Sequence, residues 1–552
     1  MPGRILAASL ALWLAAEALA QTDALPALGE APTLAATPAL AELEARGARI
    51  GEIIIDAQDI FDLDDPRENN IVFRAANALH IRTRPDVVRR ALLFKPGDPL
   101  SVRVIEETER LLRDNPYLYD VVIRPVQVHE DGAVDLEVVT RDTWSLKPDV
   151  SYGREGGVDT GSISIEERNL LGTGISVSIG RVKEIDYSGT EFALSDRHAF
   201  GGWTEVNYVY SDLDTGHRNA LSVAQPFYAL DTREAAGVSA FDGDRIASDY
   251  RAGEIVSQYH HAQRTLDVFA GRSAGLENSW VQRFSVGYNY DSHAFSLDPT
   301  RDPPERLPED YDLSGPYFRY ELIQDDVRRV RNFDQIERPE FFDLGFRTAL
   351  QIGRALESLG ATHDSWIYKL ALSDGATGSG GQVLLANAAV SGRYDELDSR
   401  RQLSAEARYY VPRGSTSLFY ASVSGAVSKS PDIYDVLQIG GDSGLRGYPL
   451  RYQTGDRRFL ATLEQRIYTD YFPFRLFRVG GAVFFDVGRA WGGDFDPGDA
   501  EQGWLADFGF GLRILSARSA FGNVIHIDVA FPAVTGPNID SAQLLVKSRT
   551  SF

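Results

Sequence analysis

Three short motifs contain residue types that could perform enzyme or metal chemistry. Residues 441–444 read GDSG, a form found around serine nucleophiles, but a catalytic triad also needs a base and an orienting acid, and the neighbouring sequence offers no obvious pair. His260 and His261 are adjacent, so on a strand they point to opposite faces and cannot ligate one metal together. The stretch 375–381 lacks the lysine of a phosphate loop and is typical of a hairpin tip. We therefore expect no catalytic residue, no metal site and no cofactor.

Two charged residues, Arg446 and Asp486, have the chemistry of a strong ion pair. Arg446 lies in a glycine-flanked loop, and a guanidinium can donate two parallel charge-assisted hydrogen bonds to a carboxylate, which lysine cannot reproduce. Asp486 lies in a predicted strand, 482–488, in which apolar Val483, Phe485 and Val487 alternate with Phe484, Asp486 and Gly488. The alternative reading is that Arg446 is one of many arginines on a solvated loop.

The composition excludes several classes of protein. The 552 residues include 56 Lys and Arg against 79 Asp and Glu, a net charge of −23, which counts against a nucleic-acid binder. The absence of cysteine from the sequence excludes disulfides, thiol catalysis and cysteine-ligated metals. Fifty glycines with 24 Tyr, 28 Phe and 7 Trp favour a large β-structure.

The N-terminus has the features of an export signal. Residues 1–20 contain one basic residue, Arg4, then an apolar run of about twelve residues and an A-x-A site, so we predict a signal peptide. The alternative is a membrane anchor, but a spanning helix needs roughly 20 apolar residues. Residues 21–48, rich in Ala and Pro, are predicted to be a linker.

A small α+β domain is predicted over residues 49–142. Ile53, Ile54 and Ile55 indicate a strand, and a helix is expected to begin at Pro99 with Asp98 as its cap. Two strands, 119–128 and 133–140, flank a turn at 129–132. The predicted order is β-α-α-β-β, which any small α/β domain could share.

Residues 143–552 show the two-residue periodicity of strands. For example, Phe508, Phe510 and Leu512 alternate with Gly509 and Gly511. This alternation fits both a soluble sandwich and a transmembrane barrel, but the number of successive segments behind an export signal favours the barrel. Counting the segments gives nearer twenty candidate strands than sixteen.

Three stretches together resemble the BamA/TamA superfamily of outer-membrane barrels that insert or translocate proteins. Residues 77–101 and 109–125 look like a POTRA domain, the periplasmic unit that precedes such barrels. Leu445, Arg446, Gly447 and Tyr448 look like the family motif on the sixth extracellular loop. Phe484, Asp486 and Gly488 match the F-x-D-x-G motif of the thirteenth strand. The resemblance implies an all-β barrel of 16 antiparallel strands after one POTRA domain, with Arg446 paired to Asp486 so that the loop is held inside the barrel.

The C-terminus fits this resemblance in part. The chain ends in Phe552, the terminal aromatic residue expected of an outer-membrane closing strand. Ser548 and Thr550 stand where larger apolar residues are usual.

The resemblance implies a protein that inserts or translocates client polypeptides at the bacterial outer membrane and is not an enzyme. Its partners would be unfolded outer-membrane or secreted clients and outer-membrane lipid, with a possible periplasmic partner at the POTRA domain. A client would pair by β-augmentation with the POTRA sheet edge or with the first and last barrel strands. Two alternatives are a passive diffusion pore, which predicts neither a POTRA domain nor the Arg446–Asp486 pair, and an outer-membrane hydrolase.

Overall fold

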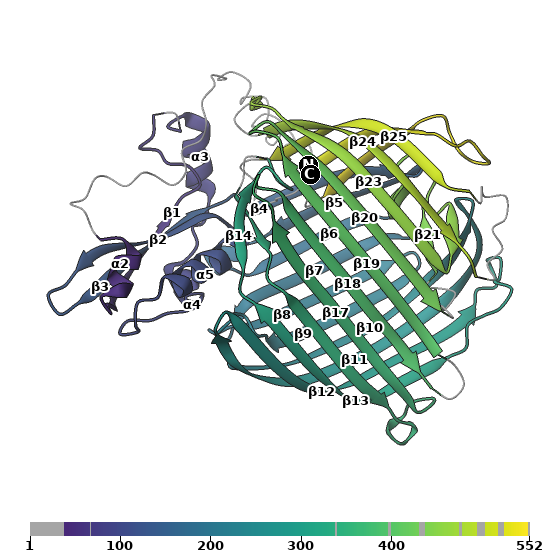
Figure 1. The fold of residues 1–552 in the computed structure, drawn as a ribbon, viewed down its shortest axis with the longest axis horizontal. Helices are drawn as coiled ribbons and strands as arrows, with labels where there is room; N and C mark the ends of the chain where they lie inside the picture. Colours follow the sequence, from purple (N-terminus) through teal and green to yellow (C-terminus); the bar gives the residue numbers. More distant parts are fainter. Residues whose placement is uncertain are drawn as a thin grey trace, which may run out of the picture.

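The computed structural model shows a small N-terminal domain packed against one end of a large β-barrel (Figure 1). The structure describes residues 38–66, 68–336, 339–395, 399–429, 436–473, 477–493, 503–516 and 524–549. The predicted signal peptide, 1–20, most of the predicted linker and Phe552 lie outside the described residues. We call the barrel end beside the N-terminal domain the near end and the opposite end the far end.

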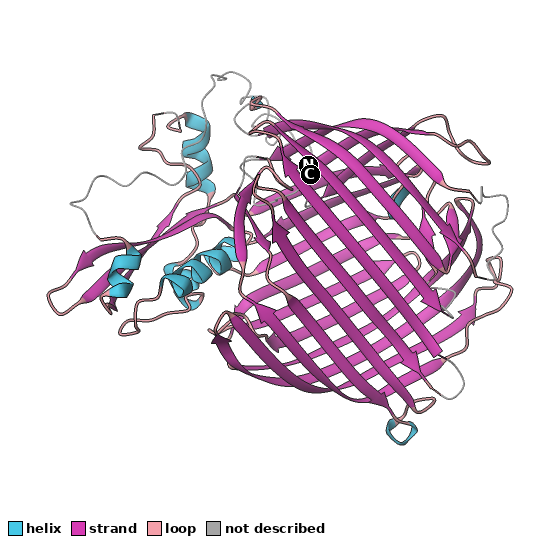
Figure 2. Ribbon diagram, viewed as in Figure 1, coloured by secondary structure: helices cyan, strands magenta, loops and turns pink. Residues whose placement is uncertain are grey.

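The N-terminal domain is a three-stranded sheet covered by helices, with strand order β1-β3-β2 (Figure 2). Its elements are α2 (Leu40–Ala45), β1 (Arg49–Gln58), α3 (Ile71–Leu79), α4 (Pro85–Arg90), α5 (Val102–Arg113), β2 (Leu118–Val128) and β3 (Ala133–Asp142). β1 pairs with β3 in parallel and β2 pairs with β3 in antiparallel fashion. The core between sheet and helices includes Ile50, Val88, Ile105 and Leu136, all almost completely buried.

Two details of this domain differ from the sequence prediction. Three helices rather than two lie between β1 and β2, because α3 precedes α4 and α5. Asn70 caps α3 by accepting the N–H of Phe73 at 2.9 Å. Helix α5 begins at Val102 rather than Pro99, with Ser101 at its N-cap. Asp98 instead accepts the N–H of Lys95 at 2.9 Å, which closes the turn before the helix.

Residues beyond the domain form a closed barrel of twenty strands, counted over the described residues, and not the sixteen that the resemblance implied. Its strands are β4 (Leu146–Glu155), β5 (Val158–Glu167), β6 (Ser176–Lys183), β7 (Ser188–Ala199), β8 (Thr204–Leu213), β9 (Gly216–Gln225), β10 (Glu234–Arg251), β11 (Glu254–Glu277), β12 (Trp280–Leu297), β13 (Tyr311–Gln324), β16 (Arg347–Ala355), β17 (Ser365–Thr377), β18 (Val383–Tyr394), β19 (Ser399–Pro412), β20 (Ser417–Lys429), β23 (Arg457–Tyr468), β24 (Phe477–Trp491), β25 (Leu505–Ser516), β26 (Val524–Pro532) and β27 (Gln543–Arg549). Neighbouring strands pair in antiparallel fashion, and β27 meets β4 to close the barrel.

The barrel has twenty strands because each of these segments with a two-residue period pairs with an antiparallel neighbour on both sides. The count made from periodicity alone was therefore nearer the structure than the count taken from the family. The strand that carries Asp486, β24, is the seventeenth rather than the thirteenth. Counted from the C-terminus it is the fourth in both schemes, so the four additional strands precede it.

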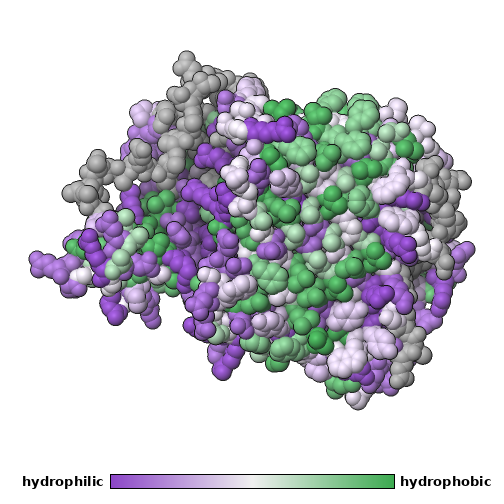
Figure 3. All heavy atoms as spheres, viewed as in Figure 1, coloured by the Kyte–Doolittle hydropathy of each residue, from purple (hydrophilic) through white to green (hydrophobic). Residues whose placement is uncertain are grey.

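The barrel has an apolar outer surface and a polar inner one. On β25, Phe508, Phe510 and Leu512 are 42–56% exposed on the outside, whereas Asp507 and Arg513 are fully buried inside. On the face of the barrel that Figure 3 shows, apolar residues are spread over its middle, with polar residues gathered toward its ends and on the N-terminal domain. This pattern is that of a barrel surrounded by lipid. Within the described residues, none of the helices is long and apolar enough to cross a membrane.

The N-terminal domain is fixed to the near end by contacts with several barrel turns. Trp203, from the turn between β7 and β8, packs against the domain core. Glu107 of α5 accepts the N–H of Leu230 at 2.8 Å, and burial raises the pKa of this carboxyl group. Asn169 donates to the hydroxyl of Thr83 at 2.8 Å. Together these contacts orient the sheet relative to the barrel.

A hairpin between β13 and β16 inserts its turn into the near end of the barrel. Strands β14 (Val327–Arg331) and β15 (Pro339–Asp343) flank the described turn 332–336. Phe333 and Ile336 are almost completely buried against one side of the inner wall, formed by seven consecutive strands from β18 to β26. The wall residues are Val383, Tyr410, Leu418, Tyr468, Ala482, Leu515 and Val524. We call residues 332–336 the inner turn.

Glu340 on β15 stabilises the inner turn and makes it sensitive to pH. Its carboxylate accepts the N–H of Phe333 at 2.9 Å and that of Asp334 at 2.7 Å. Burial, with a contribution from the Asp334 carboxylate, raises the pKa of Glu340 to about 7, even though the two N–H donors act in the opposite direction. Because the folded-state pKa lies above the ordinary value of 4.5, this group lowers the free energy of unfolding as pH rises through 4.5 to about 7.

We therefore expect the free energy of unfolding to fall between pH 5 and pH 8 in the native protein, and Glu340→Gln to remove much of that fall, because glutamine does not titrate. Glutamine also loses one of the two acceptor oxygens at both pH values, so its effect on stability should be more favourable at pH 8 than at pH 5. Thermal unfolding in detergent micelles at pH 5 and pH 8 measures this difference. Glu309→Gln, on an exposed far-end turn, is the matched control. An equal effect of Glu340→Gln at both pH values would contradict the prediction.

Candidate functional site

The candidate site is formed where the loop between β20 and β23 folds back inside the far end of the barrel. The loop contains β21 (Leu437–Ile439), the 3-10 turn η4 (Gly441–Ser443) and β22 (Gln453–Gly455), and β21 pairs with β22. Leu445 and Tyr448 are 1% and 0% exposed, which shows that the loop packs against the barrel wall. It is the eighth far-end connection in the strand order rather than the sixth.

Arg446, at the centre of this loop, contacts three carboxylates on three different strands. Its Nε and Nη2 donate to the two carboxylate oxygens of Asp486 on β24, at 2.7 and 3.1 Å. Its Nη1 donates to Glu464 on β23 at 3.1 Å and to Asp528 on β26 at 3.4 Å. The bidentate geometry uses the planar guanidinium, which the ammonium group of lysine could not reproduce.

The three residues of the F-x-D-x-G motif all face the loop. The Phe484 ring lies under the guanidinium of Arg446, 3.3 Å from Cζ to the ring centroid. At Gly488, an added Cβ would come within 2.5 Å of the Ile439 side chain and 2.7 Å of the Phe459 carbonyl oxygen. A side chain there would meet the backbone of the neighbouring strand β23 as well as the loop, and this favours glycine.

The other residues of the loop motif complete the contact with the wall. The N–H of Gly447 donates to Asp507 on β25 at 3.0 Å, and the Tyr448 hydroxyl donates to the Ala506 carbonyl oxygen at 2.8 Å. Leu445 has a left-handed backbone, with φ of 60°. Such a backbone is costly for leucine and persists here because the burial of Leu445 fixes it.

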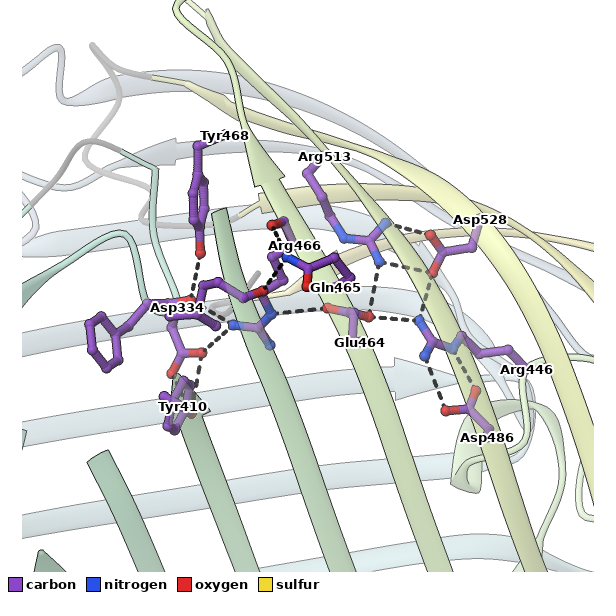
Figure 4. Close-up of polar contacts among 12 residues, drawn as sticks. Asp334, Tyr410, Arg446, Glu464, Gln465, Arg466, Tyr468, Asp486, Arg513 and Asp528 are labelled. Carbon is purple, nitrogen blue, oxygen red and sulfur yellow. Dashed lines mark hydrogen bonds and ion pairs between the residues drawn. The ribbon is translucent and has the colours of Figure 1, made fainter. Parts of the chain in front are cut away.

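The ion pairs extend from Arg446 along the inner wall to the inner turn (Figure 4). Glu464 also accepts from Arg466 at 3.0 Å and lies 3.5 Å from Arg513, and Arg513 pairs with Asp528. Arg466 donates to the Phe333 carbonyl oxygen at 2.6 Å and to Asp334 at 3.2 Å. The far-end loop and the near-end inner turn therefore share one network of buried charges, with Glu464 at its centre.

Sequence reasoning singled out Arg446 and Asp486, and the structure brings them together, but it missed several other members of the network. These are Asp334, Glu464, Arg466, Arg513 and Asp528. A signal was present: each of the four on strands β23, β25 and β26 occupies the inward phase of its strand. A charge in that phase must find an opposite charge inside the barrel.

The remaining residues considered in the sequence lie apart from this network. The Ser443 hydroxyl donates to the Gly440 carbonyl oxygen at 2.9 Å. His260 lies 3.5 Å from Asp298, whereas His261 hydrogen-bonds to His293 at 2.8 Å. The glycine-rich stretch ends in a hairpin turn between β17 and β18, as predicted.

Comparison with known proteins finds similar folds. No protein-family model and no curated protein matches the sequence. Among solved structures, the chain is similar to BamA from Haemophilus ducreyi lacking POTRA domains 1-3, with 12% identity, 91% of this chain and 84% of that chain covered, and a TM-score of 0.40. CdiB from Acinetobacter baumannii and CdiB from Escherichia coli also match with 12% identity over 91% of this chain, covering 74% and 76% of those chains with TM-scores of 0.45 and 0.48.

We expect Arg446→Ala to destabilise the barrel by about 3–5 kcal/mol, because it leaves three carboxylates without their shared cation. Arg446→Lys should behave more like Ala than like the native residue. In a double-mutant cycle with Asp486→Ala, measured by thermal unfolding in micelles, the two changes should be coupled by about 1–3 kcal/mol. Additive effects would show that the two side chains do not depend on each other.

The inward position of the loop can be tested by cysteine labelling, because the native sequence has no cysteine. Ser443→Cys should react slowly with a membrane-impermeant maleimide on intact cells and quickly once the barrel is unfolded. Leu359→Cys, on the far-end 3-10 turn η3 (Glu357–Leu359), is 45% exposed and should react at once. Equal rapid labelling of both positions would contradict the folded-in loop.

Proposed function

We propose that this chain is an outer-membrane barrel that inserts or translocates client polypeptides, with the N-terminal domain acting as a periplasmic POTRA domain. Clients would pair with the strands at the junction of β27 and β4, which we call the seam. The observation that carries the proposal is the weakness of this junction. In the described residues, its register consists of one pair, Val546 with Arg154, whereas neighbouring strands β4 and β5 pair over ten residues.

Among the residues that the structure describes, the contacts that close the seam are few and partly exposed. Lys547 and Glu155 form an ion pair at 2.7 Å, with side-chain exposures of 28% and 12%. An ion pair of this kind stabilises a structure far less than a row of backbone hydrogen bonds. A strand edge that opens at the seam would offer N–H and C=O groups to an incoming strand.

The N-terminal sheet offers a second place for a client strand, but its outer edge is partly occupied. On β2, the N–H of Ile123 donates to Glu109 at 2.7 Å, and Arg113 donates to the Val121 carbonyl oxygen. A client pairing along this part of β2 would first have to displace both side chains of α5. The seam is therefore a better candidate for strand pairing than the β2 edge.

The arrangement supports this function over the two alternatives. A passive diffusion pore needs neither a docked N-terminal domain nor a loop fixed to the wall by a buried arginine. A hydrolase needs an activated nucleophile, and the Ser443 hydroxyl donates to a backbone carbonyl oxygen rather than to a base.

A disulfide across the seam tests the proposal. We expect the Arg154→Cys, Val546→Cys variant, once oxidised, to lose the ability to speed the folding of an unfolded outer-membrane barrel protein added to proteoliposomes. Reduction should restore it. The matched control is Ala349→Cys with Ala371→Cys, a register pair of β16 and β17 away from the seam. If the oxidised seam variant keeps full activity, clients do not pass through the seam.

A further inference from the structure

The loop motif continues beyond the residues recognised in the sequence to a second arginine, Arg451. Its two terminal nitrogens donate to the two carboxylate oxygens of Asp186, at 3.0 and 2.6 Å. Its guanidinium also lies over the Tyr250 ring, 4.5 Å from the centroid, and Nε is 3.6 Å from Asp442. Tyr250 donates its hydroxyl hydrogen to Asp186 at 2.7 Å, so the acceptor is itself held in place.

The two partners of Arg451 outside the loop, Asp186 and Tyr250, lie on the other side of the seam from the partners of Arg446. Asp186 lies in the turn between β6 and β7, the third and fourth barrel strands, and Tyr250 lies on β10, the seventh. Asp486 and Asp528 lie on β24 and β26, near its end. The five peptide bonds from Arg446 to Arg451 therefore connect the first strands to the last strands from inside.

The segment between the two arginines touches the first hairpin of the barrel directly. An added Cβ at Gly156, in the turn between β4 and β5, would come within 2.3 Å of the Leu450 backbone nitrogen. At Gly253, in the turn between β10 and β11, an added Cβ would come within 2.7 Å of the Pro449 side chain. Both glycines have positive φ. A larger residue would therefore strain the backbone as well as overlap with the loop.

We propose that residues 446–451 are an internal clamp across the seam, in which Arg451 and Asp186 are positioning residues that hold the first strands against the last. This clamp deepens the proposed function. It rests on that function only in assuming that the seam between β27 and β4 opens for a client. The clamp supplements the single register pair of β27 and β4 and the Lys547–Glu155 ion pair. Opening of the seam then requires Arg446 or Arg451 to separate from its carboxylate partners.

The two ends of the clamp differ in strength, and the difference sets the order of release. Arg446 is bound by three carboxylates whose side chains are 3–5% exposed. Arg451 is 20% exposed and its main partner, Asp186, is 33% exposed. Because water screens and competes for the exposed pair, Arg451 releases first and the loop stays on the β23–β26 wall.

The test measures the width of the seam without any client. Spin labels on cysteines replacing Tyr152 and Leu544, exposed outer residues of β4 and β27, report the distance across the seam by pulsed electron resonance in nanodiscs. We expect Arg451→Ala to increase the population of longer distances several-fold. Arg354→Ala is the matched control, because Arg354 also pairs with a far-end aspartate, Asp364, and lies over an aromatic ring, but contacts neither loop nor seam.

A charge reversal keeps the proposal testable if the alanine variant folds poorly. Arg451→Asp alone should widen the distance distribution, and Arg451→Asp with Asp186→Arg should narrow it again. An unchanged distribution in Arg451→Ala, or the same change in Arg354→Ala, would overturn the clamp. Since the readout contains no client, the clamp can fail while client insertion stands, and loss of client insertion would leave the distance result intact.

Discussion

A charge buried inside the barrel needs a counter-charge, and the rest of the structure depends on how this need is met at the Arg446 guanidinium. Its three carboxylate partners come from three strands, β23, β24 and β26, so one side chain fixes the register of the loop against most of the C-terminal wall. The excess negative charge that these partners would leave is balanced by Arg466 and Arg513. Removing one of these charged side chains leaves its partners buried without a counter-charge, which destabilises the folded barrel. The loop, the wall and the inner turn are therefore interdependent.

The sequence predicted much of the barrel and the central ion pair, since alternation marks which residues face inward and Arg446 and Asp486 lie in distinctive motifs. It did not predict the strand number, because the resemblance supplied a count that periodicity alone contradicted. Asp98 was wrong as a helix cap because a backbone turn at Lys95 binds its side chain instead. Arg451 and Asp186 could not be paired from sequence, since they are 265 residues apart and their contact depends on how the barrel closes.

The twenty-strand barrel and the predicted pair of Arg446 and Asp486 are compatible because the site is local to the last strands. Every carboxylate that binds Arg446 lies on β23, β24 or β26, so strands added before the loop leave these contacts unchanged. A wider barrel would separate the loop from the opposite wall. The loop does not need to reach that wall, because the first strands lie beside the last ones at the seam, and Asp186 is within reach of Arg451.

The backbone of the loop ties its conformation to the closure of the barrel. Leu445 and Arg451, at the two ends of the segment, have φ of 60° and 49°, a left-handed conformation that costs non-glycine residues about 1–3 kcal/mol each. Leu445 is held by burial against the last strands, and Arg451 by its contacts with the first ones. The loop can contact both surfaces at once only when β27 has met β4. The segment therefore has a reason to adopt this backbone only in the closed barrel, and a seam that opens removes the contacts that offset the strain at Arg451. Relief of this backbone strain at Arg451 then favours the state in which Arg451 has left Asp186. The strained backbone of the closed barrel therefore helps the seam to open once Arg451 has separated.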